Sequence, residues 1–215
     1  MTKSSLINKK WLGLTSYSDS MKIQNEALNR ILQEPHQQAL LGFEYDRVLT
    51  LGKRAHAKEL PTSVHSQFDV IATDRGGLAT LHSRGQLVIY PLVDLKNRNV
   101  GVRAFIQTLH AVSSNFLLEL GIKNHWDFEN PQGLFTQNGK IAFCGIRVRS
   151  GVSTHGMSIN ISNALEEFSL FPACGKCDAE VTSVKEERRK EGLGFDLSLE
   201  EAFEAWSNSW MKDWG

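Results

Sequence analysis

The sequence has few cysteines, no excess of charge and no long apolar run. Its three cysteines are too few and too odd in number for a disulfide framework, which favours a reducing cytoplasm. The 24 basic and 24 acidic residues cancel, so a broad basic surface for nucleic acid is not expected. No run approaches the roughly 18 apolar residues of a membrane helix, and the first ten residues lack the apolar stretch of a secretory signal. We therefore expect a cytoplasmic protein that binds neither nucleic acid nor membrane.

The patterns along the chain predict one mixed α/β domain over residues 1–215, since neither repeats nor a linker interrupt them. Apolar spacing predicts helices at 18–33, with Ser18 or Asp19 as N-cap, at 101–120 and at 197–210. Asn138-Gly139 is a strong hairpin signal between two strands. Strands are predicted at 11–13, 39–43, 48–51, 68–73, 87–95, 133–137, 140–148 and 157–161. The strands at 68–73 and 87–95 are apolar enough to be of the buried type.

Lys140 is the first candidate for chemistry. It begins a predicted strand and shares a face with Ala142, Cys144 and Ile146, because alternate side chains of a strand point the same way. Burial disfavours the charged form of a lysine and would suit it to proton transfer. The alternative is that Lys140 ends the hairpin and extends its ammonium group into water. Spacing alone leaves both open and favours the second.

Cys174 lies in a turn-like stretch, Phe171 to Gly175, where its thiol could be a nucleophile if a base or cation is near. It could also be a small buried apolar residue. Cys174 and Cys177 form a Cys-x-x-Cys motif. A redox motif is disfavoured because it comes late in the chain after Pro172. A zinc site is disfavoured because no second paired motif exists, so no metal is predicted.

A glycine-rich loop, Arg75-Gly76-Gly77, follows a predicted strand and precedes Thr80, His82 and Gln86. Such loops expose backbone N–H groups that suit an anionic or carbonyl-bearing ligand, although a glycine pair often only makes a turn. His155-Gly156 precedes another predicted strand. We expect His155 either to line the same cleft or to be a structural histidine.

Together these stretches resemble the lipoyl(octanoyl) transferase family over residues 11–182. An Arg-Gly-Gly loop, a Gly-Lys-Ile strand, a His-Gly pair and a late Cys-Gly pair occur in the family's order and spacing. The matching blocks are Trp11-Leu12-Gly13 with Tyr17 and Gln24, Asp74 to Gln86, Gly139 to Asn160, and Cys174-Gly175 with Thr182.

The resemblance implies an α/β fold like the catalytic domain of biotin and lipoate ligases, with a mixed sheet flanked by helices. It implies an ATP-independent acyltransferase without a cofactor, in which Cys174 takes an octanoyl group from octanoyl-acyl carrier protein as a thioester. Lys140 would favour the thiolate and move protons. The acceptors would be lysines in lipoyl domains of 2-oxoacid dehydrogenases and in the glycine cleavage H protein. The stretches that match the family's acyl-binding residues are Arg75, Gly76, Gly77, Leu78, Ala79, Thr80, Leu81 and His82, then Phe143, Cys144 and Gly145, then Gly156, Met157 and Ser158.

Three departures from the family pattern stand out. Leu81 replaces an aromatic residue, Ser83-Arg84 replace Gly-Pro, and the residues on both sides of Cys174-Gly175 differ, including Lys176-Cys177. Two other functions stay open at this point. One is an ATP-dependent lipoate or biotin ligase on the same fold, and the other is a non-catalytic module that binds carrier or lipoyl domains.

Overall fold

The structure is a computed structural model that describes residues 6–55, 60, 64, 67–126, 133–170 and 180–214. Its centre is a seven-stranded mixed sheet with the order β1-β2-β6-β10-β9-β8-β7. β1 (Leu6–Leu14) runs parallel to β2 (Gln37–Glu44), and the other neighbours are antiparallel. The remaining strands are β6 (Gln86–Leu92), β7 (His125–Trp126), β8 (Gly133–Thr136), β9 (Gly139–Arg149) and β10 (Val152–Asn160).

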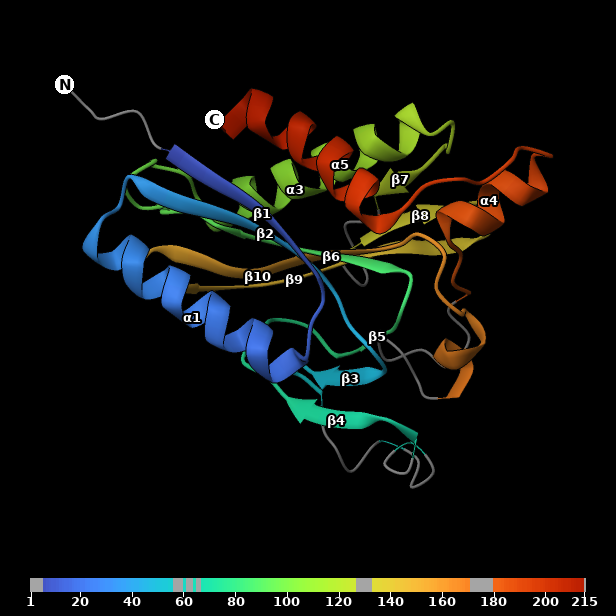
Figure 1. Ribbon diagram of the computed structural model, residues 1–215, viewed down its shortest axis with the longest axis horizontal. Helices are drawn as coiled ribbons and strands as arrows, with labels where there is room; N and C mark the ends of the chain where they lie inside the picture. The colour runs from blue at the N-terminus through green and yellow to red at the C-terminus, as the bar shows by residue number, and fades with distance from the viewer. Residues whose placement is uncertain are drawn as a thin grey trace.

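Helices cover both faces of this sheet (Figure 1). α3 (Val102–Glu119) and α5 (Leu199–Trp214) pack on one face, where aliphatic side chains of β6 and β10 meet the tryptophans of α5. α1 (Tyr17–Gln33) packs on the other face against Leu41, Phe43 and Tyr90. Alternation along each strand produces the two cores, since Leu87 and Ile89 face α5 whereas Val88 and Tyr90 face α1.

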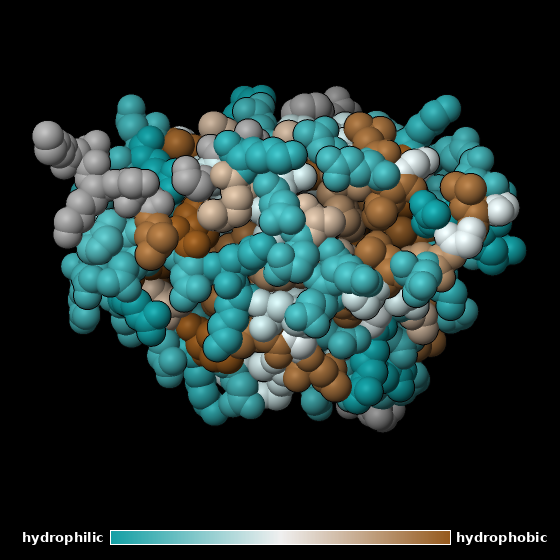
Figure 2. Space-filling model, turned by 45° about the horizontal axis from the view of Figure 1, so that its top comes forward, coloured by the Kyte–Doolittle hydropathy of each residue, from teal (hydrophilic) through white to brown (hydrophobic). Residues whose placement is uncertain are grey.

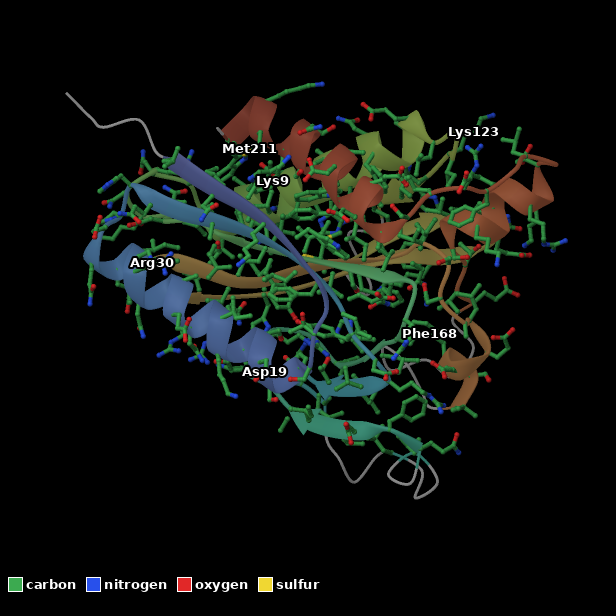
Figure 3. The ribbon with its side chains drawn as sticks, in the orientation of Figure 1. Lys9, Asp19, Arg30, Lys123, Phe168 and Met211 are labelled. Atoms are coloured by element: carbon green, nitrogen blue, oxygen red, sulfur yellow. The ribbon has the colours of Figure 1, made fainter. Side chains whose placement is uncertain are left out.

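A second sheet of three strands lies beside α1, in the order β4-β3-β5 (Figure 1). Its strands are β3 (Val48–Leu51), β4 (Asp69–Ala72) and β5 (Ala79–His82). Leu49 and Leu81 contribute to a core that also contains Phe143 of β9 and Phe168 of the 3₁₀ helix η2 (Glu166–Leu170). The Phe143 and Phe168 rings stack at 5.6 Å, and Figure 3 labels Phe168 on η2. Through this shared core the small sheet and η2 are packed onto the large sheet.

The short helix α4 (Val184–Lys190) precedes α5, and Ser183 caps its first turn. On the face seen in Figure 2, hydrophobic residues reach the surface in separate patches among hydrophilic ones. Lys9 of β1 pairs with Glu204 of α5 at 2.6 Å, close to where Figure 3 labels Lys9. Among the described residues, none of the helices combines the length and apolarity that crossing a membrane requires.

The predicted helices, the hairpin and the mixed α/β class are confirmed, with three local corrections. The N-cap of α1 is Ser16, not Ser18 or Asp19, because the Ser16 hydroxyl accepts the Asp19 amide at 3.1 Å. β10 begins at Val152, so His155 lies inside this strand and not before it. β4 is half-exposed because it is an edge strand, although its apolar sequence predicted a buried one.

Candidate active site

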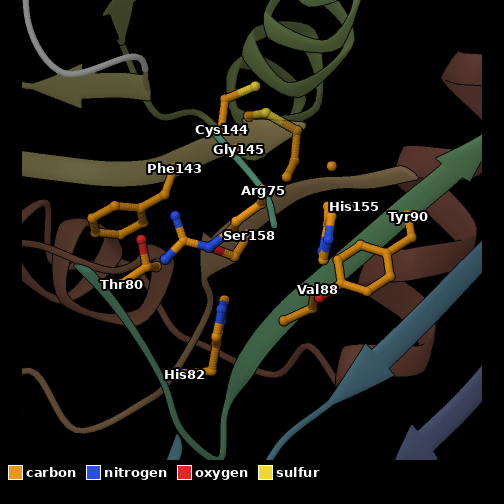
Figure 4. A pocket seen from close by; sticks show the side chains of 12 residues that line it. Arg75, Thr80, His82, Val88, Tyr90, Phe143, Cys144, Gly145, His155 and Ser158 are labelled. Atoms are coloured by element: carbon orange, nitrogen blue, oxygen red, sulfur yellow. The ribbon is translucent and has the colours of Figure 1, made fainter. Parts of the chain in front are cut away.

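A narrow pocket of about 30 Å³ lies between the small sheet and the large sheet (Figure 4). It is lined by the loop of Arg75, by β5 of the small sheet, and by β6, β10 and β9, which are neighbours in the large sheet. The lining residues are Arg75, Thr80, His82, Val88, Tyr90, Phe143, Cys144, Gly145, His155, Gly156, Met157 and Ser158.

The Arg75 side chain is buried and held by the backbone and hydroxyl of one residue of β3. Its Nη2 donates to the carbonyl oxygen of Thr50 at 2.7 Å and to the hydroxyl at 2.8 Å, and Nη1 donates to the Gly76 carbonyl at 3.0 Å. The Gly76 amide in turn donates to the Ile146 carbonyl of β9 at 3.0 Å. The Arg-Gly-Gly loop is therefore fixed to both sheets, and the guanidinium group adds a positive charge to the wall of the pocket.

His155 is held in a conformation that few residues other than glycine adopt, with φ of 57°. Its amide donates to Oε1 of Gln24 on α1 at 2.6 Å, and its Nε2 donates to Oδ1 of Asp74 at 2.8 Å. The other carboxylate oxygen of Asp74 pairs with Arg147. Burial, with Arg75 and Arg147 nearby, lowers the pKa of His155 to about 3, so its ring is neutral at physiological pH.

His82 is the second neutral histidine of the pocket. Its Nδ1 donates to Oε1 of Gln86 at 2.6 Å, and the amide of Gln86 donates to Oδ1 of Asn160 at 2.9 Å. Burial lowers the pKa of His82 to about 3 despite the Gln86 hydrogen bond. Both histidines can therefore accept or donate hydrogen bonds without adding charge to the pocket.

Lys140 is among the largest fully buried side chains, with 2 % of its surface exposed. Its ammonium nitrogen lies 4.6 Å from the ring centre of Phe143 and 5.4 Å from that of Phe135. Phe143 lines the pocket, so the ammonium group lies beside a ring of the pocket wall, where the negative faces of two rings stabilise it. The alternative in which Lys140 extends into water is wrong.

Two positions next to Lys140, Gly133 and Gly139, have no room for a residue larger than glycine. A Cβ atom on Gly133 would lie 2.5 Å from Cε of Lys140, and one on Gly139, where φ is 134°, would lie 2.6 Å from the Glu180 backbone. The Lys140 amide donates to the Glu180 carbonyl at 2.8 Å, and the Thr182 amide donates to the Lys140 carbonyl at 3.0 Å. Residues 180–182 therefore run directly beside Lys140.

Cys174 and Cys177 lie outside the described residues, in the segment 171–179 that connects η2 to Glu180. Cys144 is the one cysteine that the described part of the chain contains, and it lines the pocket. Burial raises the pKa of the Cys144 thiol to about 12, although Lys140 acts in the opposite direction. This thiol is therefore protonated at neutral pH and is a poor nucleophile.

The structure brings together most of the residues predicted to bind the acyl group. Nine of the fourteen line the pocket, namely Arg75, Thr80, His82, Phe143, Cys144, Gly145, Gly156, Met157 and Ser158. Gly76, Gly77 and Leu78 belong to the loop behind Arg75, while Ala79 and Leu81 point into the core of the small sheet. Val88 and Tyr90 were missed, because a continuous apolar strand gives no sign of which side chains meet a pocket.

The departures from the family pattern are accommodated locally. Leu81 is fully buried beside Phe143 and Phe168, so it fills the core under the pocket. Arg84 lies at the surface and pairs with Asp46 at 3.3 Å. Gly85 follows with φ of 88°, packed against the backbone of Asn163. The changes next to Cys174, including Cys177, fall outside the described residues.

Comparison with solved structures shows which fold this chain has. A lipoate-protein ligase A bound with ATP superposes with a TM-score of 0.76 at 17% identity, covering 97% of this chain and 85% of that one. A biotin protein ligase from Leishmania major superposes with a TM-score of 0.61 at 12% identity, covering 94% and 72%. The fold is that of lipoate and biotin ligase catalytic domains, as the sequence predicted.

Comparison of the amino-acid sequence with those of other proteins shows the family of this chain. The model of the lipoyl protein ligase A/B catalytic domain matches residues 16–209, and the chain belongs to this family. A relative from Persephonella marina named octanoyltransferase is 33% identical over 174 residues, covering 80% of this chain and 84% of the relative. Another, from Anaplasma phagocytophilum, is 33% identical over 194 residues, covering 88% and 89%. The resemblance to the octanoyltransferases is confirmed.

Proposed function

We propose that this protein is a cytoplasmic octanoyltransferase of protein lipoylation that works without ATP. Its donor is octanoyl-acyl carrier protein, and its acceptors are lysines in lipoyl domains of 2-oxoacid dehydrogenases and in the glycine cleavage H protein. The family membership and the relatives named octanoyltransferase support the reaction. The pocket between the two sheets has largely apolar walls, which is the character that an acyl-binding site requires.

The proposed reaction has two acyl transfers. The thiolate of Cys174 attacks the thioester carbonyl of the donor, and the thiol of the carrier protein leaves with a proton. The amine of the target lysine then attacks the Cys174 thioester, loses a proton, and leaves as the amide while the Cys174 thiol is restored. Lys140 exchanges the protons in both steps, because a buried amine beside the pocket is suited to general acid–base catalysis. The acyl group arrives already activated, so no ATP is consumed.

The observation that carries this proposal is the burial of Lys140 beside Phe143 of the pocket wall and directly beside residues 180–182. Glu180 follows Cys174 by only six residues, so the chain that bears the proposed nucleophile continues alongside the proposed base. Burying a lysine costs free energy, and its burial at this position is explained if the amine exchanges protons with a reacting group.

The direct test is the intact mass of the protein after it is mixed with octanoyl-acyl carrier protein and no ATP. We expect an increase by one octanoyl group, located on Cys174 by peptide mapping, which disappears when a lipoyl domain is added. Transfer that requires ATP would instead indicate a ligase. A protein that binds the carrier without acquiring the octanoyl group would indicate a non-catalytic module.

A further inference from the structure

Glu187 on α4 is a nearly buried carboxylate that neither the pocket nor the proposed reaction uses. Its Oε1 accepts the hydroxyl of Thr182 at 2.5 Å. The side-chain amide of Asn138 donates to Oε1 at 3.2 Å and to Oε2 at 3.1 Å. A buried carboxylate is costly unless it is hydrogen-bonded, and here two residues from separate segments satisfy it.

Both donors lie close to Lys140 in the chain or across the sheet. Asn138 belongs to the turn two residues before Lys140, and Thr182 belongs to the segment whose backbone is hydrogen-bonded to Lys140. Glu187 therefore holds the turn that carries Lys140 and the segment that follows Cys174 in fixed relative positions.

The contacts continue from Thr182 to the pocket. The side-chain amide of Asn160 donates to the Thr182 carbonyl at 3.0 Å, and Asn160 Oδ1 accepts from Gln86, which also accepts from the pocket residue His82. Hydrogen bonds in a buried network of this kind stiffen the elements they connect. The turn of Lys140, the segment 180–182 and the floor of the pocket are thus joined through side chains that are all buried or half-buried.

We propose that Glu187 is a positioning residue for Lys140, acting through Asn138 and Thr182. The proposal rests on the proposed function, in which Lys140 exchanges protons during acyl transfer. Glu187 touches no reacting atom. Its loss releases the turn, and a displacement of a catalytic group by about 1 Å can cost about 10²-fold in rate.

The neighbouring Glu186 provides a matched control on the same helix. Its carboxylate pairs with Arg189 at 2.7 Å at the surface and contacts none of the network. Glu187→Ala and Glu186→Ala remove the same group from adjacent positions, and Glu187→Gln keeps the oxygen that Thr182 and Asn138 share. Thr182→Val removes one donor with little change in volume, in case Glu187→Ala folds poorly.

The first measurement is amide hydrogen exchange, which needs no activity. We expect Glu187→Ala and Thr182→Val to speed exchange of the Lys140 and Thr182 amides at least tenfold, with Glu186→Ala at the wild-type rate. Unchanged protection in the folded variants would overturn the proposal, whatever the protein transfers. Faster exchange throughout the sheet would also overturn it, because that pattern belongs to general destabilisation.

The second measurement is octanoyl transfer at a temperature where every variant is folded. We expect Glu187→Ala to lower kcat about 10–100-fold with KM for the carrier protein unchanged, and Glu187→Gln to recover most of the loss. If Lys140→Met is impaired while Glu187→Ala equals Glu186→Ala, the positioning role is wrong and the proposed function stands. If wild type transfers nothing, the proposed function is wrong, and the exchange result alone decides whether Glu187 holds the turn.

Discussion

The two faces of the large sheet bury different chemistry. The face under α3 and α5 is filled by aliphatic side chains and by Trp206, Trp210 and Trp214, whose rings stack in series at 5.5 and 4.8 Å. The face toward α1 and the small sheet encloses the pocket and buries Arg75 and His155 among tyrosines. An apolar core tolerates exchange of one hydrophobic side chain for another, whereas each buried polar group depends on its own partners.

The two faces of the large sheet therefore contribute differently: one mainly stabilises the domain, and the other holds the groups of the proposed reaction. On the face under α3 and α5 the side chains are held by burial of apolar surface, which has no directional requirement. A substitution there should therefore change the free energy of unfolding more than the rate of the reaction. The face toward α1 and the small sheet holds buried polar groups, including His155, whose backbone has a positive φ. Such strained and desolvated groups are not needed for stability alone. Four substitutions or conditions can break or sharpen this division.

The largest effect on the reaction is expected for Cys174→Ala. Without another proposed nucleophile, octanoyl transfer should fall by at least about 10³-fold, and the acyl-enzyme should disappear from the intact-mass spectrum. Cys144→Ala is the matched control, because the half-buried Cys144 thiol is protonated and its loss should leave the octanoyl adduct in place. An adduct that persists in Cys174→Ala would refute the proposed mechanism.

Lys140→Met should lower octanoyl transfer by about 10²–10⁴-fold, the range for loss of a general acid or base. Methionine keeps much of the apolar stem that packs on Gly133, so the fold should survive, as circular dichroism would confirm. Lys185→Met, an exposed lysine on α4, serves as control and should transfer at the wild-type rate. Equal rates in all three proteins would show that Lys140 is structural.

Trp206→Ala tests the opposite face. The side chain is fully buried and its indole donates to Ser113 at 2.9 Å, so the free energy of unfolding should fall by about 3–5 kcal/mol. The kcat of the folded fraction should change less than threefold, on the order of 0.6 kcal/mol. Urea unfolding and rate measurements on the same samples check both. Leu118→Ala, at an exposed position of α3, should be nearly neutral.

Mild acid should lower the stability of the fold through its buried histidines. Burial lowers the pKa of His82 and His155 to about 3 and that of His110, on α3, to about 4. The unfolded chain binds these protons near pH 6.5, so stability is full above that pH and falls below it, by up to about 1.4 kcal/mol per pH unit for each histidine.

Urea unfolding at several pH values between 7.5 and 4.5 measures this slope. His110→Gln should flatten it by about one third, because it removes one of three buried histidines. His125→Gln, at an exposed position, controls for the substitution itself. A slope that is steeper in His110→Gln than in wild type would contradict the assignment of His110 as buried and neutral.

Much of the fold could be predicted because local signals agreed with it. The apolar spacing of residues 101–120 marked α3, which is followed by Gly121 with φ of 80°, a common helix terminator. Asn138-Gly139 marked the β8–β9 turn. The division of the strands between two sheets left no such signal, since β2 and β3 are separated only by a short turn yet pair with different partners.

Most residues of the candidate site could be predicted from the sequence, but their positions relative to one another could not. Most of the residues taken from the family resemblance do meet around one pocket, but Val88 and Tyr90 come to it from a strand with no chemical motif. For Lys140, spacing favoured a solvated side chain. Lys140 is buried because residues 180–182 lie beside β9. This contact joins distant parts of the chain, so a local pattern does not encode it.

The sequence by itself determined the α/β class, the three long helices, the hairpin and the family, because periodicity, turn residues and motif spacing are local and can be recognised without the fold. The tertiary structure alone decided that Lys140 is buried, that His82 and His155 are neutral, and that Glu187 joins the turn of Lys140 to residues 180–182. These properties depend on which distant segments exclude water from a side chain and supply its hydrogen-bond partners, and only the packed fold specifies that.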